Sequence, residues 1–189
     1  MLAAHLGLGG GHHTLDAACA SSLYALHLAS LELMLGRLDA VLAGGVSSPD
    51  SLYTQMGFTQ LRALSRTGRC RPFDQAADGL IVGEGAGIFV LKRLSDARAA
   101  GDEILGVIAG IGLSNDIEGG LLAPSTEGQL RAMRLAYRMA GLADGDVDYF
   151  ECHATGAPVG DRVELETLGK LLGPREPREK RPIGSVKGV

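Results

Sequence analysis

The clearest pattern along this chain is a run of residues at helical spacing after position 19. The positions that recur at intervals of three and four residues are Leu23, Leu26, His27, Ser30, Leu31 and Met34. This spacing predicts a buried helix that ends near Gly36, because glycine commonly follows the last turn of a helix. Further helices are expected at residues 95–101 with Ser95 as N-cap, at residues 126–141, and at about residues 161–172.

Short apolar runs between these helices predict strands. The runs are residues 39–45, 88–91, 104–113, 147–151 and 183–186, and the residues just before position 19 also read as extended. Because strands and helices alternate, we expect an α/β protein with layered helices on a mainly parallel sheet. A boundary near residues 99–103 is expected to divide the chain into two halves, residues 1–99 and 100–189.

Composition and charge narrow the class of protein. The 189 residues are 46% hydrophobic and 21% charged, which suits one globular domain. A net charge of −4 without a basic stripe argues against nucleic acid or a membrane surface as partner. The first residues lack a basic flank followed by an apolar core, so we expect no signal peptide, and we also expect no segment that crosses a bilayer. The 3 cysteines lack paired spacing, which favours a reducing cytoplasm and no metal centre.

Cys19 is the first candidate for chemistry, because it stands where an extended segment runs into a helix. The first N–H groups of a helix lack internal partners and carry partial positive charge. A thiol at that position gains thiolate character, and the thiolate is the nucleophile. The alternative is a buried structural cysteine, since free cysteine is among the most buried residue types.

His153 is the second candidate, because it follows a predicted strand at a position where α/β folds place ligand-binding groups. Small residues after it leave room for a substrate arm. A cysteine nucleophile and a distant histidine suit acyl transfer, since such partners meet in space and not in sequence. The alternatives are a histidine with a purely structural hydrogen bond, or a cysteine hydrolase, for which the sequence places no orienting acid near His153.

Five motifs in order give the chain a family resemblance. They are residues 16–23 (Asp-Ala-Ala-Cys-Ala-Ser-Ser-Leu), 70–74 (Cys-Arg-Pro-Phe-Asp), 83–87 (Gly-Glu-Gly-Ala-Gly), 151–156 (Glu-Cys-His-Ala-Thr-Gly) and 184–187 (Gly-Ser-Val-Lys). The chain resembles the ketosynthase domain of polyketide and polyunsaturated-fatty-acid synthases, in the thiolase superfamily. The resemblance implies a partial thiolase-like fold, with residues 1–99 carrying the nucleophile and residues 100–189 carrying the first histidine.

The resemblance also implies a reaction and a role for each site residue. The reaction is a decarboxylative Claisen condensation between an acyl thioester and a malonyl unit. Cys19 takes the acyl group, His153 stabilises the enolate, Lys187 supports the histidine, and Thr155 contacts the phosphopantetheine arm. The domain itself binds no cofactor, because its substrates are carried on the phosphopantetheine of acyl carrier protein. The full-length domain is expected to be a homodimer.

Departures from the family pattern lead us to expect a fragment, truncated at both ends and impaired in activity. The family's second histidine, its N-terminal strands and its C-terminal glycine-rich segment are not found in these residues. Ala157 stands where a threonine is common, and Ala154 replaces a glycine. Uncovered apolar edges predict poor solubility. The alternative is a non-catalytic thiolase-fold partner subunit or an inactive fragment, although such partners usually lack the cysteine.

Overall fold

The computed structural model describes residues 2–48, 51–118, 124–143, 145–174 and 180–188. These residues form two compact units that are interleaved along the sequence. Unit 1 comprises Met1–Ser47 and Glu84–Ile108, and unit 2 comprises Ser48–Gly83 and Ala109–Val189. The predicted boundary at residues 99–103 divides the chain at a single point along the sequence, whereas each compact unit combines two separate segments. The boundary therefore stays a prediction.

Unit 1 is built on one pair of antiparallel strands. Strand β1 (Ala40–Ser47) pairs along its 8 residues with strand β2 (Gly85–Lys92). The predicted strand at residues 39–45 therefore forms, but the parallel orientation expected for it is wrong. The burial expected for this strand is also wrong for most of its residues, since Ala43 is the one residue of β1 that is buried. An apolar run does not indicate the direction of its partner, which here comes from a distant part of the chain.

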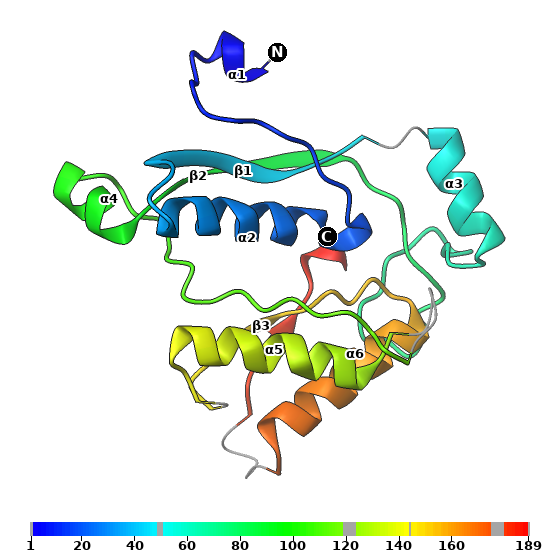
Figure 1. Ribbon diagram of the computed structural model, residues 1–189. Coiled ribbons are helices and arrows are strands. Elements are labelled where there is room, and N and C mark those ends of the chain that lie inside the picture. The colour runs from blue at the N-terminus through cyan, green and yellow to red at the C-terminus, as the bar shows by residue number, and fades with distance from the viewer. Residues whose placement is uncertain (1, 49–50, 119–123, 144, 175–179, 189) are drawn as a thin grey trace. The chain divides into compact units, whose positions relative to one another are not determined.

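Helix α2 (Ser21–Met34) packs against β1 in unit 1 (Figure 1). Ala29 and Leu33 are the buried positions of this helix. Small residues permit a close approach, because a Cβ at Gly45 of β1 would lie 3.0 Å from Ser22 Cβ. The predicted helix is thus confirmed, and Gly36 just beyond it has a φ of +67°. Its predicted burial is confirmed only in part, since Leu23 and Met34 are exposed. The short helix α1 (Leu2–His5) precedes these elements.

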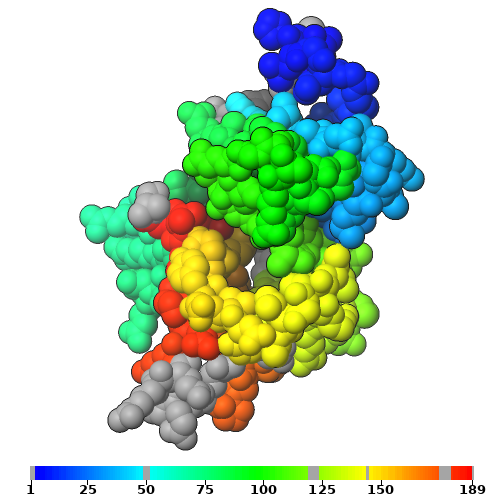
Figure 2. All heavy atoms as spheres, turned by 90° about the vertical axis from the view of Figure 1, so that its left-hand side faces the viewer, coloured from blue at the N-terminus to red at the C-terminus, as the bar shows by residue number. Residues whose placement is uncertain are grey.

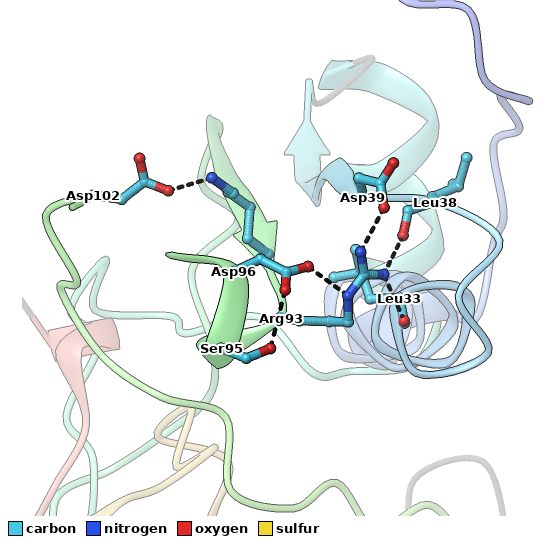
Figure 3. A network of polar contacts seen from close by, with 8 residues as sticks. Leu33, Leu38, Asp39, Arg93, Ser95, Asp96 and Asp102 are labelled. Carbon is cyan, nitrogen blue, oxygen red and sulfur yellow. Dashed lines mark hydrogen bonds and ion pairs between the residues drawn. The ribbon is translucent and has the colours of Figure 1, made fainter. Parts of the chain in front are cut away.

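Arg93 joins three segments of unit 1 through its guanidinium group (Figure 3). It donates to the carbonyl oxygens of Leu33 at 3.0 Å and Leu38 at 2.7 Å, and it pairs with Asp39 and Asp96. The end of α2, the start of β1 and helix α4 (Leu94–Ala100) are thereby held together.

Helix α4 begins one residue earlier than the sequence predicts. Arg93 occupies the N-cap position and makes no side-chain capping bond there, so the prediction of Ser95 as N-cap is wrong. The Ser95 hydroxyl instead donates to Asp96 at 3.0 Å. Much of α4, drawn in green in Figure 2, lies at the surface of its unit, with Ala97 as its buried residue.

Unit 2 contains three helices and one pair of short parallel strands among its described residues. They are α3 (Ser51–Gln60), α5 (Thr126–Ala140), β3 (Phe150–Glu151), α6 (Pro158–Leu172) and β4 (Ile183–Gly184), followed by the 3₁₀ turn η3 (Val186–Gly188). Helices α5 and α6 pack against each other. The predicted strands at residues 147–151 and 183–186 form only at these two-residue cores.

Helix α5 agrees closely with its sequence pattern. Ser125 caps its start by accepting hydrogen bonds from the amides of Glu127 and Gly128, at 3.2 and 3.5 Å. Gly141 ends it in the left-handed conformation with a φ of +67°. These are the two capping devices most favoured at their respective ends.

The hydrophobic core of unit 2 lies beside the segment predicted to carry the histidine. Cys152, Ala154 and Leu168 are buried together, and Phe73, Met133 and Phe150 pack against them. Within the described residues, we find no helix with the length and apolar character needed to span a lipid bilayer.

Candidate active site

The backbone around Cys19 is held in an unusual turn. Cys19 lies in the 3₁₀ turn η1 (Ala18–Ala20), directly before α2, and its side chain is exposed. Ala18 has a φ of +50°, a left-handed conformation that costs a non-glycine residue about 1–3 kcal/mol. Its amide donates to Asp16 Oδ1 at 2.8 Å, and its carbonyl oxygen accepts from the Ser21 hydroxyl at 2.6 Å. These bonds stabilise a turn that presents Cys19 to solvent at the start of a 14-residue helix.

The other two cysteines are less available for reaction. Cys152 is 6% exposed, and burial followed by the charge of Glu164 raises its pKa to about 11. The Cys70 thiol donates to the carbonyl oxygen of Thr155 at 3.3 Å, and its pKa is raised, first by burial and then by Asp161. Of the three thiols, Cys19 is therefore the one whose surroundings leave it open to an electrophile.

Glu164 of α6 holds the backbone of the histidine segment. Its two carboxylate oxygens accept hydrogen bonds from the amides of His153 at 2.7 Å and Ala154 at 2.8 Å. The buried methyl group of Ala154, 1% exposed, fixes the same segment from the core side. His153 as a residue lies at the surface, although the surrounding protein removes part of the water from its ring. Glu164 therefore orients this histidine through the main chain and leaves its ring free.

The electrostatic surroundings of His153 favour the neutral imidazole. Its pKa is lowered, first by desolvation in the surrounding protein and then by the positive charge of Lys187, while Glu164 and Asp161 act in the opposite direction. A neutral imidazole has one N–H donor and one acceptor nitrogen, so it can donate a hydrogen bond to a carbonyl oxygen.

A polar loop, residues 70–79, lies against the segment that follows His153. The amide of Gly79 donates to the carbonyl oxygen of Gly156 at 3.0 Å, and the Cys70 thiol bonds to Thr155. Asp161, buried at the start of α6, accepts from the amide of Phe73 at 2.9 Å. Thr155 is thus enclosed by backbone on one side and lies two residues from His153.

Lys187 lies in the η3 turn, which belongs to the same unit. The amide of Val186 donates to Glu151 Oε1 at 2.7 Å, and the Ser185 hydroxyl donates to the carbonyl oxygen of Ala154 at 2.9 Å. Pro72 of the polar loop lies under the same turn, because a Cβ at Gly188 would come within 2.9 Å of its Cδ atom.

The structure brings together three of the four predicted site residues. His153, Thr155 and Lys187 lie in unit 2, and Cys19 lies in unit 1. The sequence analysis missed Glu164 and Asp161, which stand three residues apart in the helix predicted at about residues 161–172. That spacing, on one face of a helix directly after the histidine motif, is the signal that could have found them. Among the described residues, no group of three His, Cys, Asp or Glu side chains is arranged to hold a metal ion.

Comparison with known proteins assigns the chain to a family. The family model described as beta-ketoacyl synthase, N-terminal domain, matches residues 1–97, and the model described as beta-ketoacyl synthase, C-terminal domain, matches residues 105–189. With more than half of its residues matched, the chain belongs to the beta-ketoacyl synthase family.

Its relatives include large polyketide synthases. Over 184 residues the chain is 45% identical to a phenolphthiocerol/phthiocerol polyketide synthase of Mycobacterium tuberculosis, a match that covers 96% of this chain and 10% of that protein. It is also 45% identical over 184 residues to erythronolide synthase EryA3 of Saccharopolyspora erythraea, covering 96% of this chain and 6% of that one. The chain thus spans about a tenth or less of these relatives.

Solved structures confirm the expected α/β, thiolase-like fold. The ketosynthase from module 6 of the bacillaene synthase of Bacillus subtilis 168 matches with a TM-score of 0.90 and 37% identity, over 99% of this chain and 34% of that one. The PfaC keto synthase–chain length factor matches with a TM-score of 0.88 and 46% identity, over 96% of this chain and 20% of that one.

Proposed function

We propose that this chain supplies the nucleophile and the first histidine of a β-ketoacyl synthase site in polyketide or fatty acid biosynthesis. The reaction is the decarboxylative condensation of an acyl thioester with a malonyl thioester. Membership of the beta-ketoacyl synthase family and the polyketide synthases among its relatives support this proposal. The supporting observation within the structure is the exposed thiol of Cys19 at the head of a long helix.

The first step is transfer of an acyl group to Cys19. The thiolate sulfur of Cys19 attacks the carbonyl carbon of the incoming acyl thioester and forms a new C–S bond. The C–S bond to the carrier breaks, and the carrier sulfur takes up the proton that Cys19 gave up and leaves as a thiol. The Cys19 side chain is open to solvent, as access by a carrier-bound substrate requires.

The second step uses the neutral imidazole of His153. Loss of carbon dioxide from the malonyl group leaves an electron pair at its α-carbon, and the charge is shared with the thioester oxygen as an enolate. A donated hydrogen bond from His153 stabilises that oxygen, and one such donor is commonly worth ~10²–10³ in rate. The carbanion then attacks the acyl carbonyl on Cys19, a new C–C bond forms, and the C–S bond breaks to regenerate the Cys19 thiolate.

Lys187 and Thr155 act around this histidine in our proposal. Desolvation, and after it the charge of Lys187, lower the pKa of His153, which favours the neutral imidazole. The carbonyl oxygen of Thr155 accepts a hydrogen bond from the Cys70 thiol. We propose that the side chain of Thr155 contacts the phosphopantetheine arm. Ala157 lacks a hydroxyl, so we assign no contact with this arm to it.

The partner that fits this reaction is an acyl carrier protein, whose phosphopantetheine brings both substrates. We assign no bound cofactor to the domain itself. We also propose a homodimer for the full-length domain, and a cytoplasmic site of action that suits the free thiols of Cys19, Cys70 and Cys152.

The test is acyl transfer in the full protein that contains this sequence. We expect an acyl thioester to label Cys19 alone in peptide maps, and the label to disappear in Cys19→Ala. We also expect His153→Ala to lower the release of carbon dioxide from malonyl carrier protein by about 10²–10³-fold, with labelling of Cys19 retained.

Two outcomes would replace this function with the alternatives. Equal labelling of Cys70 and Cys152, or none of Cys19, would indicate a non-catalytic thiolase-fold protein. Release of free acid from labelled Cys19, at a rate that malonyl carrier protein does not change, would indicate a cysteine hydrolase.

A further inference from the structure

Glu151 is a carboxylate that the proposed reaction does not use, yet both of its oxygens are engaged. Oε1 accepts from the amide of Val186 at 2.7 Å, and Oε2 accepts from the Tyr149 hydroxyl at 2.6 Å. These two bonds lower the pKa of Glu151, first the bond from Tyr149 and then that from Val186. The carboxylate is therefore charged at neutral pH and fixed between a strand and the η3 turn.

The backbone around Glu151 places that turn in a defined register. Glu151 stands opposite Gly184 in the β3–β4 pair, and the amide of Cys152 donates to the carbonyl oxygen of Gly184 at 2.8 Å. The Tyr149 ring lies over Gly184, because a Cβ at that position would overlap the phenol oxygen. The lack of a side chain at Gly184 makes room for the Tyr149 ring, whose hydroxyl donates to Glu151.

Val186 begins the three-residue turn that carries Lys187. The first amides of such a turn lack partners within it, and a charged carboxylate is a strong acceptor for them. Glu151 satisfies the first amide, and the Ser185 hydroxyl accepts from the amide of Lys187 at 3.3 Å. The direction of the lysine side chain depends on the orientation of this turn.

We propose that Glu151, held by the Tyr149 hydroxyl, is a positioning residue that fixes the Val186–Gly188 turn and so keeps Lys187 beside the His153 segment. Its importance for catalysis rests on the proposed function, whereas its effect on the position of Lys187 does not. Glu151 acts through the main chain of the turn, as Glu164 does through the main chain of the histidine segment.

The sign of one measurement separates this role from a direct charge effect. Lys187, Glu164 and Asp161 are the charged groups that act on the pKa of His153. If Glu151 acts by holding Lys187 in place, its removal lets the lysine move away and the pKa of His153 rises. If its own negative charge acted on the imidazole, its removal would lower that pKa.

The experiment is an NMR titration of the protein labelled at histidine Cε1, with His153→Asn to assign the signal. We expect Glu151→Ala to raise the pKa of His153 toward the value seen in Lys187→Met, with no further rise in the double variant. Glu151→Gln is the matched control, because its amide oxygen still accepts from Val186 and its amide group can donate to Tyr149. It should keep the wild-type titration.

Activity gives a second readout. Misplacing a catalytic group by about 1 Å can cost 10²-fold, so we expect Glu151→Ala to lower carbon dioxide release by about that factor and Glu151→Gln to restore most of it. If Glu151→Ala does not fold, Tyr149→Phe tests the same contact with a smaller change, and its titration should move in the same direction.

A pKa of His153 that is unchanged or lowered in Glu151→Ala, in a folded protein, would overturn the proposal. A raised pKa with no acyl transfer to Cys19 would leave the positioning role standing and refute the proposed function. Normal acyl transfer to Cys19 with an unchanged pKa of His153 would refute the positioning role and leave the proposed function standing.

Discussion

The three thiols differ in how far each is buried and in the groups that each contacts. The pKa of Cys152, raised to about 11 by burial, keeps this thiol protonated over the working range of most proteins. Cys70 is partly covered, and its thiol is engaged with Thr155. Cys19 is exposed on the turn that precedes α2.

We therefore predict a strict order of alkylation by iodoacetamide at pH 8, with Cys19 first, then Cys70, then Cys152. At that pH only about 0.1% of a thiol with the pKa of Cys152, about 11, is ionised, and Cys152 is also buried. Peptide mapping by mass spectrometry at increasing times gives the order. In Cys19→Ala the fast phase should vanish, and a fast phase that persists on Cys152 would contradict its burial.

The residues expected to do chemistry were visible in the sequence, but those that hold them were not. Cys19, His153 and Lys187 stand in short motifs whose order is specific. In the sequence, Glu151 is only the first residue of the 151–156 motif and Glu164 is only one residue of a predicted helix, so no role was predicted for either. Their roles depend on which backbone amides come within 3 Å after folding, and no local pattern encodes that distance.

At the scale of elements, the extended segment before α5 shows how glycine permits close packing. A Cβ at Gly112 would overlap the carbonyl oxygen of Ala132 in α5, and one at Gly110 would overlap that of Ala136. The sequence predicts a strand at residues 104–113, but no strand is assigned there. The segment lies against the helix through these two glycines instead.

We predict that Gly112→Ala destabilises the protein by about 2–4 kcal/mol, because either the segment or α5 must move to make room for the methyl group. Gly106→Ala is the matched control, since a Cβ at Gly106 would meet no atom within 4 Å. Urea unfolding followed by circular dichroism gives both values. Equal stability of the two variants would show that the segment does not pack on α5 this closely.

Helices were easier to predict than strands for a physical reason. Helix α5 can be predicted from Ser125 at its start, Gly141 at its end and the apolar stripe between them, which are all local in the sequence. The direction and length of β1 depend on a partner strand that begins at Gly85. Non-local pairing of this kind cannot be deduced from the apolar run itself.

At the scale of the whole molecule, the β1–β2 pair leaves much apolar surface exposed. Ile88, Phe89 and Val90 of β2 are 54%, 57% and 69% exposed. Because side chains alternate along a strand, Phe89 faces one side of the sheet while its two neighbours face the other. Apolar surface on both faces of a strand commonly promotes association.

We predict that these 189 residues, expressed alone, self-associate as protein concentration rises. Val90→Lys should reduce the association measured by size-exclusion chromatography with light scattering. Leu105→Lys is a control with the same change in charge at a residue that is 88% exposed outside the strand pair. A monodisperse monomer at every concentration would contradict the prediction, as would equal effects of the two substitutions.

The bond pattern of Glu164 has a practical consequence for protein engineering. Glu164 accepts its hydrogen bonds from the backbone amides of His153 and Ala154. These bonds do not involve the side chain at position 153. Different side chains could therefore be introduced at position 153 while these two backbone hydrogen bonds are kept, and each variant could be assayed for new reactions.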